Sequence, residues 1–183
     1  MRTHIIVLIA FVCIFASCGE KQTDPVKAAI AEKIAAQTGE DSKVYFSALE
    51  LVDSTTFGAE IARRRNTLEI RRKQNLNLAV QYKTEGKFKN EAAKNADAAN
   101  DLRHLEGLAA IEARLAANDS LDVVEAYIYK FSGSARTYKG TVNFTDMFVS
   151  ITPQHEVVGM DYKKEGVLKS AGRLIPGYSA LFE

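Results

Sequence analysis

Apolar residues follow two patterns near the start of the chain. The first is a nearly continuous apolar run from Ile5 to Ala16. The second is periodic, because Val26, Ile30 and Ile34 recur every four residues. That spacing indicates a helix with one buried face. We therefore expect the folded body to begin with this helix, at about residue 25.

Four later segments carry the alternation and the β-branched and aromatic side chains that favour strands. They are residues 43–53, 123–131, 140–152 and 157–160. The expected fold class is α+β, with an N-terminal helix and a four-stranded antiparallel sheet. This element order resembles the cystatin-like plan, in which a sheet wraps a helix. Residues 25–165 are predicted to form one domain, and the glycine-containing stretch 166–183 a loosely structured C-terminal tail.

A long helical hairpin is expected to be inserted at about residues 56–117. Residues 57–117 contain no proline and consist mostly of good helix formers. One helix of that length would measure about 90 Å, which is too long for a domain of this size. The sequence Thr-Glu-Gly-Lys at 84–87 is the natural break. We therefore predict two antiparallel helices whose base packs on the core while the tip projects.

Charge differs between the two arms of this hairpin. Residues 56–83 hold seven basic and two acidic side chains, and residues 90–117 hold three basic and five acidic ones. Facing residues should have numbers that sum to about 172 if the turn is centred near Gly86. That register predicts three ion pairs of opposite sign: Arg71 with Asp101, Glu69 with Arg103, and Arg65 with Glu106. The basic runs at 63–65 and 71–73 are therefore interpreted mainly as a solvated, internally paired face, with contact to lipid headgroups as the alternative.

The start of the chain indicates export. Arg2 precedes an apolar run much shorter than the roughly 20 residues of a membrane-spanning helix, which is typical of a signal peptide at 1–17. Ala16-Ser17-Cys18 resembles the lipobox of bacterial lipoproteins. The resemblance implies cleavage before Cys18, a lipid on its thiol and a tether over 18–24. Gly19 in place of aspartate favours the outer membrane of the cell envelope over the inner membrane.

Composition excludes some function classes. The net charge is +1, and Arg2 contributes one positive charge within the predicted signal peptide. The remaining chain is therefore neutral overall and offers no bulk attraction to nucleic acid, which we do not expect as a partner. Cys13 and Cys18 are the only cysteines, so a disulfide does not staple the body.

Candidate chemistry in the body is sparse. Asp101 and His104 have the spacing of a helical carboxylate–histidine metal pair, but a second such motif is missing, so His104 is interpreted as a surface histidine. The run Ser132-Gly133-Ser134 is interpreted as a strand-end turn. We expect no catalytic residues, no cofactor and no metal.

Two short motifs suggest a modification. Asp53-Ser54-Thr55 and Asp119-Ser120-Leu121 resemble the O-glycosylation motif of exported Bacteroidetes-type proteins. Ser54 and Ser120 both fall in predicted turns, where a glycan has room. The alternative is that both Asp-Ser pairs serve only as boundaries of helices or strands.

The function expected from these features is that of a non-enzymatic, membrane-anchored envelope lipoprotein that acts as a binding or assembly module. Its partners would be the bilayer, through acylated Cys18, and an envelope protein that meets the hairpin tip at residues 84–90. Two alternatives remain. One is a small cystatin- or NTF2-like ligand-binding or enzymatic domain, and a large pocket with convergent polar groups would favour it. The other is a structural hairpin that self-associates.

Overall fold

A computed structural model describes residues 24–38 and 42–182 of the 183-residue chain. The predicted signal peptide at 1–17, Cys18 and most of the predicted tether therefore lie outside the described residues. The elements in chain order are α1 (Pro25–Thr38), β1 (Lys43–Thr56), α2 (Phe57–Thr84), α3 (Phe88–Ala117), β2 (Val124–Thr137), β3 (Gly140–Ile151), β4 (Val157–Asp161), α4 (Lys164–Ala171) and the 3-10 helix η1 (Ser179–Phe182).

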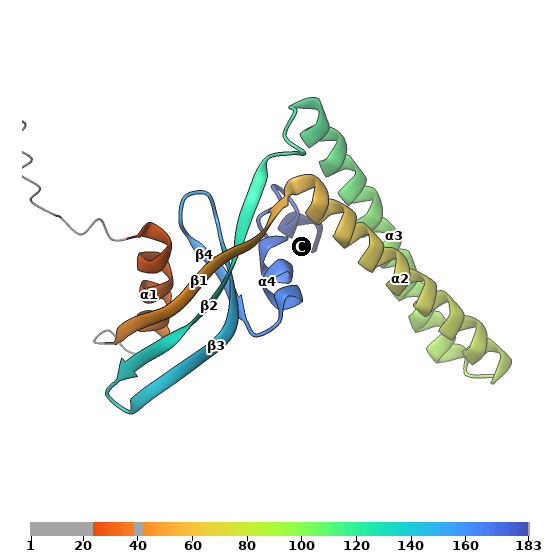
Figure 1. Ribbon diagram of the computed structural model, residues 1–183. Coiled ribbons are helices and arrows are strands. Elements are labelled where there is room, and N and C mark those ends of the chain that lie inside the picture. The colour runs from red at the N-terminus through yellow and green to blue at the C-terminus, as the bar shows by residue number, and fades with distance from the viewer. Residues whose placement is uncertain (1–23, 39–41, 183) are drawn as a thin grey trace, which may run out of the picture.

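The four strands form one antiparallel sheet in the order β1-β2-β3-β4. Helices α1 and α4 lie on opposite faces of it (Figure 1). On β4, Met160 packs against the cluster that includes α1, whereas a Cβ on Gly159 would meet Ser170 of α4. The chain is therefore α+β, with the helix, strand, hairpin and three-strand order expected from the sequence.

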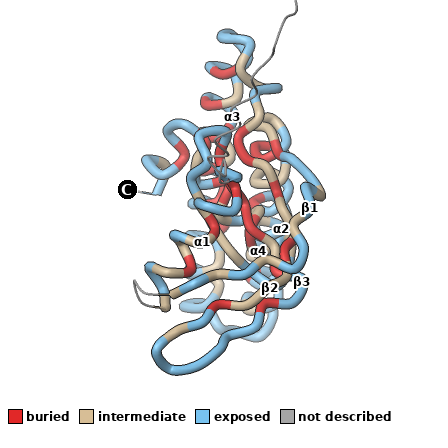
Figure 2. Tube along the Cα trace, turned by 60° about the vertical axis from the view of Figure 1, so that its left-hand side comes forward, coloured by how far each residue is buried: buried red, intermediate tan, exposed pale blue. Residues whose placement is uncertain are grey.

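Buried apolar residues form two separate clusters. Figure 2 marks the buried residues of the chain in red. The first, here called the sheet core, joins α1 to the sheet and consists of Val26, Ile30, Ile34, Phe131, Ala135, Phe144, Met147, Val149 and Ile151. The second, here called the hairpin core, joins the hairpin base to the C-terminal segment and consists of Ile61, Leu68, Leu108, Ile111, Leu115, Ile175 and Tyr178. The predicted helix face of α1 is confirmed, since its three periodic residues are all buried.

The hairpin breaks where the sequence predicted. Helix α2 ends at Thr84 and α3 begins at Phe88, with Gly86 in the left-handed region at φ +70°. The arms pack on each other and extend away from the sheet (Figure 1). Thr56 caps the start of α2, because its hydroxyl accepts a hydrogen bond from the Ala59 amide at 3.2 Å. Because β1 ends at Thr56 and α2 begins at Phe57, the two elements join without a linker.

The interpretation of Ser132-Gly133-Ser134 as a turn is wrong, because β2 continues through these residues to Thr137. Gly133 lies at a register shift and pairs with Phe46 on one side and Phe144 on the other. A Cβ there would stand 2.1 Å from the Tyr45 carbonyl oxygen. Glycine at this position therefore allows a β-bulge in which β1 and β2 approach closely. In the sequence alone, a glycine at a bulge cannot be distinguished from a glycine in a turn.

The C-terminal stretch is also more ordered than predicted. Residues 164–171 form α4 and residues 179–182 form η1. Val167, Ala171, Ile175 and Tyr178 are buried, and the last two belong to the hairpin core. Glycine and proline in this segment shape turns between packed side chains, so residues 166–182 are part of the folded body. Among the described helices, none combines the length and apolar character needed to cross a membrane.

Candidate binding groove

The hairpin and the C-terminal segment enclose a groove of about 930 Å³. It runs along α2 on one side and along α4 and η1 on the other. The volume lies within the range of small-molecule sites, roughly 300–1,000 Å³. Its lining residues are Arg63, Arg64, Thr67, Leu68, Arg71, Glu165, Leu168, Lys169, Arg173, Tyr178, Ser179 and Phe182.

Five of the lining side chains are cationic, and they differ in whether a carboxylate of the protein pairs with them. Arg63 pairs with Glu60 and Arg71 pairs with Asp101. Within the described part of the chain, no carboxylate lies within ion-pair distance of Arg64, Lys169 or Arg173. One anion, Glu165, also lines the groove. The groove therefore holds positive charge that the described residues do not neutralise.

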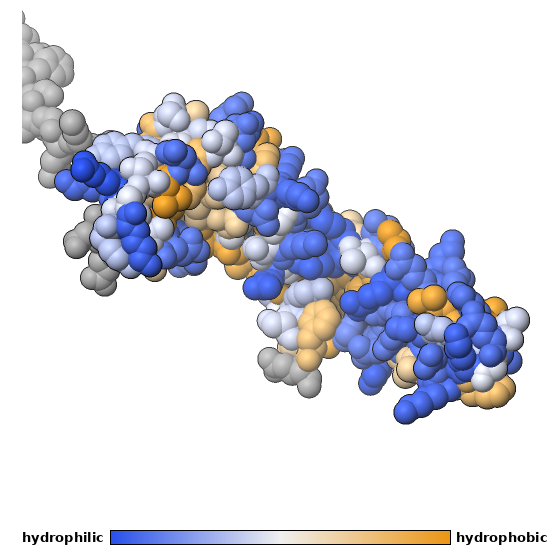
Figure 3. Space-filling view, turned by 90° about the horizontal axis from the view of Figure 1, so that it is seen from below, coloured by the Kyte–Doolittle hydropathy of each residue, from blue (hydrophilic) through white to orange (hydrophobic). Residues whose placement is uncertain are grey.

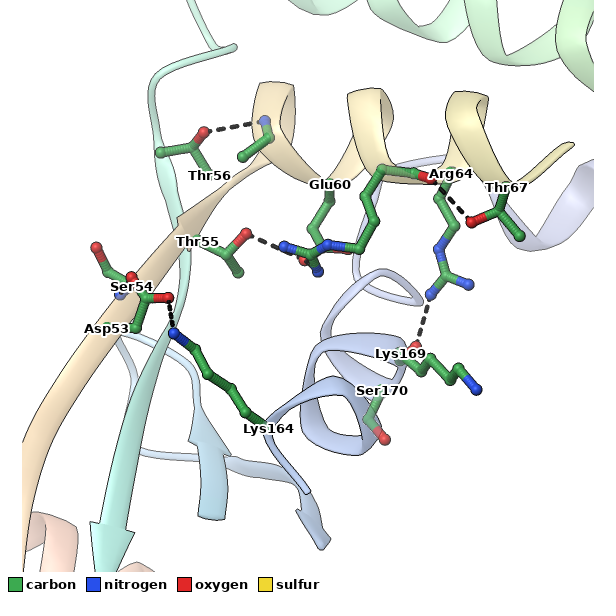
Figure 4. A network of polar contacts seen from close by, with 12 residues as sticks. Asp53, Ser54, Thr55, Thr56, Glu60, Arg64, Thr67, Lys164, Lys169 and Ser170 are labelled. Atoms are coloured by element: carbon green, nitrogen blue, oxygen red, sulfur yellow. Dashed lines mark hydrogen bonds and ion pairs between the residues drawn. The ribbon is translucent and has the colours of Figure 1, made fainter. Parts of the chain in front are cut away.

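Arg64 is held in place by three features of the C-terminal segment. Its Nη2 donates to the Lys169 carbonyl oxygen at 2.6 Å, as Figure 4 shows. Its guanidinium lies 5.3 Å from the Tyr178 ring centroid, within the range of a cation–π contact. A Cβ on Gly172 would stand 2.3 Å from that same Nη2, so glycine leaves the space that the guanidinium occupies. The Nε of Arg64 is buried without a hydrogen-bond partner.

Two buried carboxyl groups, those of Glu60 on α2 and Glu125 on β2, lie near Arg63 and Arg64 of the groove wall. Glu60 accepts a hydrogen bond from the Thr55 hydroxyl at 3.0 Å and another from Arg63 (Figure 4). Neither carboxyl oxygen of Glu125 has a hydrogen-bond partner. The pKa of Glu125 is raised to about 8, first by burial and then by the nearby charge of Glu60, while Arg64 and Arg63 oppose the shift. Glu125 is therefore mostly protonated near neutral pH.

The predicted register of the hairpin is confirmed at one pair. Arg71 pairs with Asp101 as expected. Arg65 pairs with Glu112 instead of Glu106. Glu106 is exposed, while the residues of α3 that face α2 follow the spacing of Leu108, Ile111 and Leu115.

The third predicted pair is replaced by a local contact. Arg103 and Glu69 are both exposed, and Arg103 donates to Asn100 of its own helix at 3.1 Å. The rule that facing residues have numbers summing to about 172 counts positions along each arm, but it ignores which side of the helix each residue faces. It therefore holds only where both members face the partner arm.

His104 is buried, so its interpretation as a surface histidine is wrong. The ring of Phe182 lies 4.4 Å from the imidazole, centroid to centroid, because η1 folds over α3. Asp101, the other member of the suspected metal pair, accepts hydrogen bonds from Arg71 and Asn75. Among the described residues, no group of three histidine, cysteine, aspartate or glutamate side chains is placed to hold a metal ion.

The modification sites predicted from sequence are placed as follows. Ser54 lies at an exposed position of strand β1, so its assignment to a turn is wrong, since β1 extends to Thr56. Ser120 lies in the connection between α3 and β2, and its hydroxyl contacts the Asn118 carbonyl oxygen at 3.1 Å. Cys18 lies outside the described residues.

No family model matches the chain, and neither the curated proteins nor the solved structures give a significant match. The groove was not predicted from sequence. Its α2 wall is formed by the basic runs that had been interpreted as a solvated face. Its other wall comes from the segment that had been interpreted as a tail. The remaining signal was the apolar pattern of residues 167, 171, 175 and 178, which recurs every three or four residues.

Proposed function

We propose that this protein is a non-enzymatic binding module of the bacterial cell envelope, anchored by lipid on Cys18, whose groove binds an anionic ligand. The observation that carries the proposal is the concentration of cationic side chains in one concave site. Three of them have no carboxylate partner among the described residues, so a bound anion would supply the missing charge. The outer membrane remains the favoured location, and the cystatin-like plan remains the proposed fold relationship.

Binding is favoured over catalysis by the kinds of side chain in the groove. Arginine and lysine recognise anions well but keep their protons near neutral pH, so they are poor general acids and bases there. The buried carboxyl groups of Glu60 and Glu125 could exchange protons, but neither is among the groove-lining residues. The groove is therefore best suited to holding a ligand in place.

A second candidate function is supported by the hairpin tip. Val80 and Phe88 are 66% and 68% exposed, and they lie on either side of the turn between α2 and α3. Figure 3 shows apolar side chains among mostly hydrophilic ones at the hairpin end of the molecule. Burial of these two side chains against a protein surface would remove apolar area from water, which favours association. Such a contact would let the same molecule meet an envelope protein at its tip, or a second copy of itself.

The groove is tested with two dyes of similar ring structure. Anilinonaphthalene sulfonate is anionic, and N-phenyl-1-naphthylamine is neutral; both fluoresce more strongly in apolar sites. The full-length chain, in phosphatidylcholine nanodiscs with empty nanodiscs subtracted, should bind the sulfonate about tenfold more tightly. Equal affinities for the two dyes would contradict the proposal.

Charge reversal at the rim supplies the matched comparison. Lys169→Glu with Arg173→Glu should weaken sulfonate binding about tenfold or more, because both side chains are exposed at the groove. Lys27→Glu with Lys43→Glu changes the net charge equally at exposed positions on α1 and β1. If both double variants weaken binding equally, the effect reflects overall charge and the groove is not the site.

A further inference from the structure

Apolar and charged side chains lie at different depths in the groove, apart from Arg64, whose guanidinium lies over the ring of Tyr178. Leu68 and Tyr178 are only 4% and 9% exposed, and Leu168 is half-buried, so these three form the floor. Lys169 and Arg173 are exposed and stand at the rim. A ligand that contacted only the rim would leave the apolar floor exposed to water. A ligand that contacted only the floor would leave the rim cations without an anionic partner.

The apolar surface also continues to the mouth. Phe182 of η1 is 51% exposed and lines the groove together with the more deeply placed Tyr178. The two rings lie 5.1 Å apart, centroid to centroid, in an edge-on arrangement. An extended alkyl chain would therefore find aromatic and aliphatic contacts from the floor to the mouth.

We infer that the ligand of this groove is a single-chain amphipathic anion, with its charged head at Lys169, Arg173 and Arg64 and its alkyl chain along Leu68, Leu168 and Tyr178. The inference rests on the proposed function, because it names the chemical class of the anion that the groove binds. Burial of the chain adds favourable free energy roughly in proportion to the apolar area removed from water. Arginine and lysine at the rim select against neutral and cationic heads.

The shape of the site favours a free molecule over an intact bilayer. The apolar side chains form the floor of a concave site, whereas a protein that inserts into a membrane presents its apolar side chains on a protruding surface. Leu68 and Tyr178 are too deeply buried to reach acyl chains that remain packed in a membrane. The ligand would therefore enter the groove as a monomer, separated from any lipid surface.

Competition against the bound sulfonate dye tests this assignment on the full-length chain in the same nanodiscs. Dodecanoate, used below its micellar concentration, should displace the dye about 100-fold more effectively than butyrate, which has the same head and a short chain. Dodecanol and dodecyltrimethylammonium keep the chain but replace the head by a neutral or cationic one. Each should be at least about tenfold weaker than dodecanoate.

Two variants locate the chain. Leu168→Asn at the floor and Phe182→Ser at the exposed mouth should each weaken dodecanoate about tenfold and leave butyrate unchanged. Leu76→Asn, at a 39% exposed leucine on the hairpin, is the matched control and should change neither. Because Phe182 is half-exposed, its replacement tests the inference even if the variant of Leu168 fails to fold.

The outcomes separate the two proposals. If the sulfonate dye binds but butyrate competes as well as dodecanoate, the alkyl chain contributes nothing and this inference is overturned while the anion site stands. If dodecyltrimethylammonium competes as well as dodecanoate, the assignment of the head to the cationic rim is overturned. If the dye itself does not bind the groove, the proposed function and this inference both fail.

Discussion

Arg71 and Asp101 join the two arms of the hairpin. The Nε of Arg71 donates a hydrogen bond to the Oδ1 of Asp101 at 2.7 Å, although the residues are 30 positions apart. The carboxylate also accepts a bond from Asn75 at 3.2 Å. The Asp101 side chain is only 3% exposed, whereas that of Arg71 is 51% exposed. Loss of the pair would therefore take a charged hydrogen-bond donor from the buried Asp101 carboxylate, whereas water could still hydrate the exposed Arg71 guanidinium.

Arg71→Leu should lower the free energy of unfolding by about 1–2 kcal/mol, because it leaves a buried carboxylate with one neutral donor. The estimate is kept small because water reaches the arginine and screens the pair. Urea denaturation provides the measurement. Arg71→Leu combined with Asp101→Leu should recover most of the loss, since both partners are then removed. A double variant less stable than the single one would show that Asp101 is held by other contacts.

Gly172→Ala should displace the Arg64 guanidinium without unfolding the protein. The backbone at this position has φ −61°, which alanine adopts readily, and the atom that the new methyl would meet is the end of a flexible side chain. We expect a stability change below about 1 kcal/mol and sulfonate-dye affinity reduced several-fold. Fluorescence titration of both proteins gives the comparison. Unchanged affinity would mean that Arg64 does not contribute to the anion site.

Glu125 should make stability depend on pH. Its pKa in the folded protein is about 8, above the ordinary 4.5, so between these values the unfolded chain releases a proton that the folded protein keeps. Stability therefore falls as pH rises from about 4.5 to about 8, by at most about 1.4 kcal/mol per pH unit. Glu125→Gln should flatten this slope in urea denaturation at pH 5 and pH 8.5. Glu50→Gln, at an exposed position of β1, is the control.

Cys18→Ser should release the protein from membranes or leave an unprocessed precursor, because the serine hydroxyl cannot take the place of the thiol that the lipoprotein resemblance requires. Fractionation, together with the mass of the N-terminal peptide, distinguishes these results from the wild type. Cys13→Ser is the matched control and should be processed normally. A serine variant that is still cut and acylated like the wild type would refute the lipoprotein assignment.

Local sequence patterns predicted the elements whose signals are local. The fourfold spacing in α1 and the Thr-Glu-Gly-Lys break at 84–87 depend on neighbouring residues alone, and both elements appear where expected. The errors at Gly133 and in residues 166–182 share a cause. Glycine there serves close packing against distant strands or side chains, such as Tyr45 and Arg64, and those partners are far away in sequence. The groove forms only where α2 and the C-terminal segment meet through long-range contacts, so no single stretch of the sequence predicts it.

The direct passage from β1 into α2 has a mechanical consequence. At this junction the Phe57 and Gly58 amides donate to the carbonyl oxygens of Val123 and Leu121, at 3.3 and 2.8 Å. These hydrogen bonds join the β1–α2 junction to the connection between α3 and β2, so no flexible linker separates the hairpin from the sheet. Helix α2 has 28 residues and so spans roughly 42 Å. A force applied at the hairpin tip would act through this lever as a torque on strands β1 and β2, close to the buried carboxyl groups of Glu60 and Glu125.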